Sequence, residues 1–378
     1  MASLLLVGLV EETVAFLPYG AVESIRADVG LSYVEVGVLL ALYPGVGLLA
    51  TPLGVVADHV NRRVMAAVGG VGYGLGMFLF AAADGFWMLF TAVVVMGLAG
   101  DAMVRAVEVS LVEVTGDNVE PALARSNLLG AIGDLIGPLL LVAALGSGLG
   151  WRAAFWAAGL LLIGYGLLLA TQPLPPPADG DGDDDGDGDE RLPWRALLEV
   201  ARDRRVVVAG LLVALVVAFD DTFVGFAVAF LTTERALSPA VATLAAAAGM
   251  GGGIAAAAWA SRTNRRRIGL RPCAVLLAAG VVILLAVPGV VAAALGTAAV
   301  GAGMNLAWIV LQARYLTLRP GQAGTTSAVA EGVSQIGLLT PIAIGAIGDH
   351  TSLTVAMGLY VLLGVVFVLV TWRDRAAP

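Results

Sequence analysis

Apolar residues run along this chain in long stretches, and polar residues gather in the short segments between them. A stretch of about 20 apolar residues is long enough to cross the bilayer core as a helix, whereas transmembrane β-barrels show short alternating segments. The pattern therefore predicts an all-α integral membrane protein. Divided at charges, prolines and turn residues, the sequence gives twelve predicted spans: 2–22, 33–57, 64–83, 86–112, 122–146, 152–173, 206–231, 239–260, 268–287, 290–313, 324–347 and 351–371.

The composition supports this interpretation. The chain has 378 residues, of which 59% are hydrophobic and 13% are charged, and a soluble domain could not bury so much apolar surface. All 21 basic residues are arginine, and eight of the 29 acids lie in the run 179–190. Without that run 21 acids balance 21 arginines, so the net charge of −8 resides in this one segment. Absence of lysine with an excess of aspartate is typical of a halophilic archaeon or of a very GC-rich genome.

The arginines predict how the chain is oriented in the membrane. If both termini lie on one side, that side receives 17 of the 21 arginines, the other side receives three, and Arg105 lies within a span. Short loops on the cytoplasmic side of membrane proteins are rich in basic residues. We therefore expect a multi-pass protein of the cell membrane with both termini in the cytoplasm.

One long connection divides the twelve spans into two groups of six. It begins with "PLPPP", continues through the acidic run and ends in a stretch that could form a short amphipathic helix with Trp194 at the membrane surface. A calcium loop starting at Asp181 would have Gly186 at its sixth position, but Leu192 stands where a glutamate is needed. We expect a solvated linker at 174–205, between a bundle at 1–173 and a second bundle at 206–378.

The two groups of spans resemble each other, as they do in many secondary transporters built from internal repeats. Four matches occur in the same order in both halves. They are "EET" (Glu11 to Thr13) with "DDT" (Asp220 to Thr222), "GLSYVEVGVLLALY" with "ALSPAVATLAAAAG", Arg62-Arg63 with Arg265-Arg266, and Gly137-Pro138 with Thr340-Pro341. The pattern predicts two pseudo-symmetric six-helix bundles.

Three motifs make the chain similar to the major facilitator superfamily. The segment after span 2 has Gly54, then Asp58 four residues on, then the basic pair Arg62 and Arg63, with Asn61 where glycine is usual. Span 5 contains the helix-bend pattern of that family, and "GWRAAF" opens span 6. The residues of the helix-bend pattern are Gly130, Gly133, Gly137 and Pro138. The resemblance covers nearly the whole chain and implies transport by alternating access.

The motif between spans 2 and 3 implies a gate. Asp58, Arg62 and Arg63 can form ion pairs or cap a neighbouring helix, and such bonds hold one closed state together and break in the other. The alternative is a loop whose arginines serve only to fix the orientation. The second half has Ser261 at the position of the aspartate, so the gate should be asymmetric.

The paired acids are the main candidate site. A charge at the bilayer centre costs at least about 2.5 kcal/mol, yet Glu11 and Glu12 lie near the middle of span 1, and Asp220 and Asp221 near the middle of span 7. In the family these two spans line the central cavity. Burial and mutual repulsion favour the protonated form of one member of each pair, which suits proton coupling or binding of a cationic substrate. The alternative is that the protonated acids hydrogen-bond between helices and are structural.

Further charged residues lie within spans 4, 5 and 11. Asp101 and Arg105 are four residues apart in span 4, which suits an internal ion pair, and Glu108 follows one turn later. Asp134 lies in span 5, four residues before Pro138, where it could line the cavity or cover backbone groups. Two residues of the second half could also line the cavity: Trp308 in span 10 and Glu331 in span 11. We expect Trp308 to pack against its neighbours rather than to bind a ligand.

The motifs also limit the function. The glycine runs fit no complete GxGxxG pattern, and the sequence contains no Walker loop, HExxH or GxSxG. We expect no cofactor, no metal, no nucleic-acid partner and no enzymatic activity, in a monomer that binds a small solute, a coupling ion and the lipid bilayer. Proton-coupled efflux of a cationic or lipophilic drug-like solute is favoured by the excess of acids. The alternatives are proton- or sodium-coupled uptake of a sugar or other metabolite, and a membrane sensor on a transporter scaffold.

Overall fold

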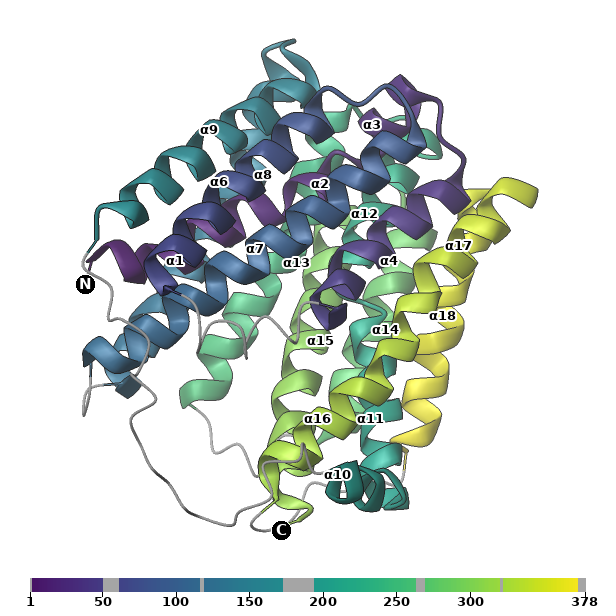
Figure 1. Ribbon diagram of the computed structural model, residues 1–378. Coiled ribbons are helices and arrows are strands. Elements are labelled where there is room, and N and C mark those ends of the chain that lie inside the picture. Colours follow the sequence, from purple (N-terminus) through teal and green to yellow (C-terminus); the bar gives the residue numbers. More distant parts are fainter. Residues whose placement is uncertain are drawn as a thin grey trace. The chain divides into compact units, whose positions relative to one another are not determined.

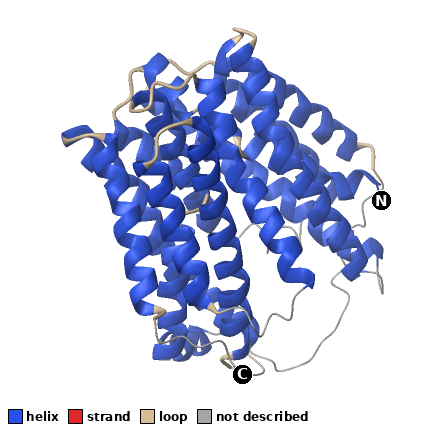
Figure 2. Cartoon of the chain, turned by 180° about the vertical axis from the view of Figure 1, so that it is seen from behind, coloured by secondary structure: helices blue, strands red, loops and turns tan. Residues whose placement is uncertain are grey.

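The computed structural model of this chain describes residues 2–49, 61–115, 119–172, 194–262, 269–319 and 322–372. Within these ranges every regular element is a helix (Figure 2), as the apolar pattern predicts. Ten stretches are long and apolar enough to cross a membrane, and two shorter apolar helices lie at Tyr33–Val46 and Leu270–Ala286. The ten long stretches and the two shorter helices together agree with the twelve predicted spans.

The helices form two compact units (Figure 1). The first unit comprises Met1–Asp179 and Gly225–Ala247, and the second comprises Gly180–Val224 and Ala248–Pro378. Two helices, α12 (Asp221–Thr233) and α13 (Pro239–Arg262), contribute residues to both units. The first unit otherwise contains α1 (Ala2–Ala15), α2 (Leu17–Gly20), α3 (Val22–Val29), α4 (Tyr33–Leu49), α6 (Arg62–Ala81), α7 (Phe86–Thr115), α8 (Val119–Gly146) and α9 (Gly150–Ala170). The second contains α10 (Trp194–Ala201), α11 (Arg204–Val217), α14 (Leu270–Ala286), α15 (Val290–Thr317), α16 (Ala323–Ser334), the short 3₁₀ helix η3 (Gln335–Leu338), α17 (Leu339–His350) and α18 (Leu353–Val370).

The same helix pairing occurs inside each unit. In the first, α1 packs on α8, and α6 packs on both α7 and α9. In the second, α11 packs on α16, and α14 packs on both α15 and α18. In span numbers, the first unit pairs span 1 with span 5, span 3 with span 4 and span 3 with span 6. The second unit pairs span 7 with span 11, span 9 with span 10 and span 9 with span 12. This correspondence is the pseudo-symmetry that the sequence repeats predict. The predicted bundle boundaries at 173 and 206 remain a prediction. The two compact units do not divide the chain there alone, because residues 225–247 belong to the first unit.

Polar side chains begin several helices by satisfying backbone N–H groups that lack an intrahelical partner. The Asn61 side chain accepts from the N–H groups of Arg63 (3.1 Å) and Val64 (3.4 Å), which explains an asparagine where the family pattern has glycine. Ser32 and Glu35 cap α4 reciprocally, because the Glu35 N–H donates to the Ser32 hydroxyl and the Ser32 N–H donates to the Glu35 carboxylate.

Span 7 is interrupted where a continuous helix was expected. Helix α11 ends at Val217 and α12 begins at Asp221, and the N–H groups of Phe219 and Asp220 bond three residues back, to Val216 and Val217. No proline lies in this turn. The interruption places the two acids at the start of α12, where the positive end of a helix dipole stabilises negative charge. Span 11 is also interrupted, by η3 between α16 and α17.

Candidate functional site: an acidic pocket in the first unit

A polar pocket lies among α1, α7 and α8. Its volume is about 240 Å³, and four carboxyl side chains line it: Glu11 and Glu12 from α1, Glu108 from α7 and Asp134 from α8. Glu11, Glu12 and Asp134 are partly buried, and Glu108 is exposed. The structure therefore brings together three of the acids that the sequence predicts as a site, and adds a fourth.

Glycines bring α1 close enough to α8 to form this pocket. A side-chain carbon added at Gly133 would lie 2.6 Å from the Leu9 carbonyl oxygen, and one at Gly137 would lie 2.6 Å from the Thr13 carbonyl oxygen. Both distances are shorter than such atoms tolerate, so only glycine permits this backbone approach. Pro138, inside α8, cannot donate to the Asp134 carbonyl four residues earlier. The helix-bend motif of the sequence therefore forms the contact that places Asp134 beside Glu12.

The carboxyl groups of the pocket are near enough to share protons. The Glu12 side chain is within hydrogen-bonding reach of both the Glu11 and the Asp134 carboxyl groups. Ionised carboxylates only accept hydrogen bonds, so a bond between two carboxyl groups requires that one of them carries a proton. The pocket can therefore hold a proton between acids, or bind a cation when the acids are ionised.

The Asp101–Arg105 ion pair lies on the same helix as Glu108. The Arg105 Nε atom is 3.6 Å from an Asp101 carboxylate oxygen, as expected for residues one turn apart. Asp101, Arg105 and Glu108 have the spacing i, i+4 and i+7, which places them on one helix face. This spacing is the signal that could have added Glu108 to the site predicted from the sequence.

The second predicted acid pair lies in the other unit. Asp221 is the first residue of α12, and Asp220 is an exposed residue of the turn before it. Discontinuous helices are where secondary transporters commonly bind substrates and coupling ions. Asp220 and Asp221 therefore remain candidates, now at the N-terminus of a half-helix.

The predicted gate motif is described in part. Gly54 and Asp58 lie outside the described residues, whereas Arg62 and Arg63 form the first turn of α6. The Arg62 side chain is buried, and the Arg63 side chain donates to the Ala170 carbonyl at the end of α9. One arginine of the pair thus links the start of span 3 to the end of span 6.

We predict that Asp58→Asn lowers transport while folded protein still reaches the membrane, because the gate implied by the family resemblance would lose an ion pair of one state only. The measurement is the initial rate of substrate movement in vesicles, normalised to the amount of folded protein. A fitting comparison is Asp84→Asn, in the exposed loop between α6 and α7. Equal rates for Asp58→Asn, Asp84→Asn and the natural protein would contradict a gating role.

Residues of spans 10 and 11 have structural partners in the second unit. Glu331 accepts hydrogen bonds from the hydroxyl groups of Tyr315 (3.1 Å) and Ser327 (2.6 Å). Trp308 packs against the buried cluster of that unit, as expected. In the part of the chain that the structure describes, no group of three or more His, Cys, Asp or Glu side chains is placed to hold a metal ion.

Two repeated bundles of membrane-length helices, with acids at a pocket inside one bundle, define a polytopic membrane transporter. A model of the major facilitator superfamily matches residues 4–340, and the chain belongs to that family. It is therefore a transporter, and small molecules and the bilayer are the partners of such proteins.

Solved structures with the same fold include transporters of several kinds. The chain is similar to the nucleoside transporter NupG in its D323A form (TM-score 0.79, 12% identity, 98% of each chain). It is also similar to an inward-facing bacterial homolog of the human lysosomal transporter Spinster (TM-score 0.73, 17% identity, 100% of this chain and 98% of that one). A D-xylose–proton symporter aligns with a TM-score of 0.73 and 16% identity, over 99% of this chain and 97% of that chain. At these identities the similarity concerns the fold alone.

Proposed function

We propose that this protein is a proton-coupled exporter of a cationic or lipophilic solute, with both termini in the cytoplasm. The observation that carries the proposal is the acidic pocket, in which Glu12 lies within hydrogen-bonding reach of Glu11 and Asp134. A proton held between these acids leaves when a cation enters, because the cation stabilises the ionised carboxylates. Proton and substrate then compete for one site, which is what an antiporter needs.

The charge balance of the pocket supports a cationic substrate. Its four acids are accompanied by Arg105 one turn from Glu108, and Arg105 is already paired with Asp101. The described residues that line the pocket include no aromatic or amide side chain. Sugars and nucleosides are recognised largely by such groups, so uptake of a neutral metabolite is the second candidate. Sodium could replace the proton as the coupling ion.

A binding experiment distinguishes the two candidates. The probes are tetraphenylphosphonium, a lipophilic cation, with uridine and D-xylose as neutral polar compounds. Thermal unfolding of the purified protein is measured with each probe at about pH 5 and about pH 8, which bracket the range in which buried carboxyl groups exchange protons. A ligand at a hundred times its Kd stabilises the folded state by about 2.7 kcal/mol.

We expect stabilisation by tetraphenylphosphonium at the higher pH and little at the lower pH, where the carboxyl groups are protonated. Stabilisation by uridine or D-xylose, equal at both pH values and absent with the cation, would favour uptake of a metabolite. Stabilisation by sodium chloride, but not by potassium chloride of the same concentration, would indicate that the coupling ion is sodium and not the proton.

A further inference from the structure

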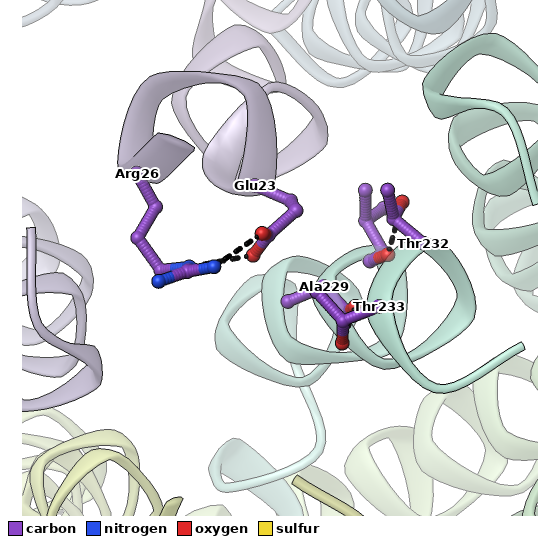
Figure 3. A network of polar contacts seen from close by, with 6 residues as sticks. Glu23, Arg26, Ala229, Thr232 and Thr233 are labelled. Atoms are coloured by element: carbon purple, nitrogen blue, oxygen red, sulfur yellow. Dashed lines mark hydrogen bonds and ion pairs between the residues drawn. The ribbon is translucent and has the colours of Figure 1, made fainter. Parts of the chain in front are cut away.

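Several threonines of this protein satisfy their hydroxyl groups within their own helix. Thr13, the residue of α1 that matches Thr222 in the sequence repeat, donates to the Leu9 carbonyl at 2.6 Å. Thr232 and Thr233, at the end of α12, donate to the carbonyls four residues earlier at 2.8 Å each (Figure 3). A hydroxyl group bonded in this way needs no donor or acceptor from outside its helix.

Thr222 differs, because span 7 is interrupted just before it. The residue four positions earlier is Ala218, which precedes the turn in which Phe219 and Asp220 bond three residues back. Thr222 is 5% exposed, and its hydroxyl oxygen makes no hydrogen bond to the described residues. The two matching threonines of the repeat therefore differ, since one hydroxyl group is satisfied and the other lacks a partner.

A second buried hydroxyl group without a partner lies beside Thr222. Tyr360, in α18, is fully buried, and its hydroxyl oxygen also has no hydrogen bond within the described ranges. The Thr222 side chain is next to this hydroxyl group, although the two are not oriented to bond each other. Phe219 and Phe223 pack on the Tyr360 ring, at centroid distances of 5.2 and 5.0 Å, and fix its position. All four residues belong to the second unit.

Two unpaired hydroxyl groups at one place indicate a third polar group between them. Leaving a buried polar group unpaired destabilises the folded state, and native structures leave few such groups. The lone pairs of a hydroxyl oxygen can accept a hydrogen bond or coordinate a cation. Water and a small cation are therefore the two candidates.

The charges at this turn favour a cation over water. Asp220 and Asp221 directly precede Thr222, and the N-terminus of α12 stabilises their ionised form. The last carbonyl groups of α11, which ends at Val217, lead into the same turn and form the negative end of that helix. Interrupted helices of secondary transporters commonly bind sodium through carbonyl oxygens that the break sets free.

We propose that the interruption of span 7 binds one sodium ion. Its ligands are the hydroxyl oxygens of Thr222 and Tyr360, the Asp221 carboxylate and a carbonyl oxygen at the end of α11. Calcium takes about six to eight oxygen ligands, several of them from carboxylates. No group of three or more acids in the described part of the chain is placed to hold a metal ion, so a monovalent ion fits better. The inference goes beyond the proposed function and holds whether or not the acidic pocket exchanges protons.

The test is the thermal unfolding of the purified protein in sodium, potassium or choline chloride at equal concentrations. Sodium should raise the melting temperature in a saturable way, and potassium and choline should not. Thr222→Val removes the hydroxyl group and nearly keeps the shape of the side chain. The sodium concentration that it requires should rise at least about tenfold, since loss of a group that only supports a metal ligand commonly has that effect.

The sign of the effect without sodium gives a second readout. In choline chloride, Thr222→Val should melt no lower than the natural protein, because valine then replaces a hydroxyl group that has no partner. The matched control is Thr232→Val, in the same helix, whose hydroxyl group is bonded to the Val228 carbonyl. We expect this control to keep the full sodium effect. Tyr360→Phe removes the other hydroxyl group and decides the matter if Thr222→Val fails to fold.

Two results would overturn the site. One is the absence of any sodium effect in the natural protein, which would leave water as the partner of the two hydroxyl groups. The other is a sodium effect of equal size in the natural protein, Thr222→Val and Tyr360→Phe. Sodium stabilisation that remains in Thr222→Val comes from elsewhere in the protein, and only that part bears on the coupling ion of the acidic pocket. Failure of this site therefore leaves the tetraphenylphosphonium result under Proposed function unaffected.

Discussion

The double substitution Glu11→Gln with Glu12→Gln is expected to abolish accumulation of substrate against its gradient. Glu11 and Glu12 supply two of the four carboxyl groups of the acidic pocket, and Glu12 is the one within reach of both Glu11 and Asp134. Without them, entry of the substrate no longer displaces a proton from this pair. A gradient of one pH unit supports about a tenfold concentration ratio when one proton is exchanged per substrate, since 1.4 kcal/mol is a factor of ten. In the double variant this ratio should fall to about one.

The measurement uses reconstituted vesicles with an imposed pH gradient and the ligand that the stability screen identifies. Single substitutions should have smaller effects, because the neighbouring carboxyl group can hold the same proton. Downhill exchange of substrate should be weakened but not abolished in the double variant, because Glu108 and Asp134 remain to bind the cation and exchange does not require release of the proton. Asp84→Asn removes one exposed acid outside the pocket and serves as the control.

The equivalent double variant of Asp220 and Asp221 tests the second half in the same assay. If both double variants still accumulate substrate to the natural ratio, the acids have a structural role. The coupling site would then be sought at the Asp101–Arg105 pair and at Asp134.

Gly133→Ala is expected to destabilise the first unit strongly. The added methyl group would lie 2.6 Å from the Leu9 carbonyl oxygen and 3.0 Å from the Glu12 Cβ atom, so α1 and α8 must separate. Overpacking of this kind destabilises the folded state by about 3 kcal/mol. Since Glu12 and Asp134 face each other across this contact, the pocket should also be distorted.

The matched control makes the same substitution at another helical glycine. Gly164, in α9, is exposed and has no atom within 4 Å of an added side-chain carbon. There alanine should leave stability unchanged or raise it by about 0.5–1 kcal/mol, because it removes the flexibility of glycine from a helix. Thermal unfolding of both purified variants provides the comparison. A melting temperature for Gly133→Ala equal to that of Gly164→Ala would show that the α1–α8 contact can yield without loss.

Much of the fold follows from the sequence, because a bilayer restricts the chain to a few solutions. Every backbone group in the hydrocarbon core must find its partner within the chain, so an apolar stretch of membrane length becomes a helix whatever its neighbours are. The repeated positions of Arg62-Arg63 and of Arg265-Arg266 then reveal two equivalent halves. The same local reasoning predicts the Asp101–Arg105 pair, since a spacing of four residues suffices to bring the two side chains together.

Contacts between distant residues could not be derived in this way. The sequence shows Glu12 and Asp134 as acids in different spans, and only the glycine contact at Gly133 makes them neighbours. Likewise, Gly20 and Thr243 lie in different halves of the sequence, and helix packing alone brings the Thr243 hydroxyl to the Gly20 carbonyl oxygen.

The sequence by itself determined that this protein is a helical membrane protein with two repeated halves and acids inside its spans, because hydrophobicity and helical spacing act over a few turns. The tertiary structure alone decided which acids share a pocket, where span 7 is interrupted and which unit the hairpin Gly225–Ala247 packs with. These features depend on how closely two backbones approach, and that distance is set by the shapes of both surfaces together.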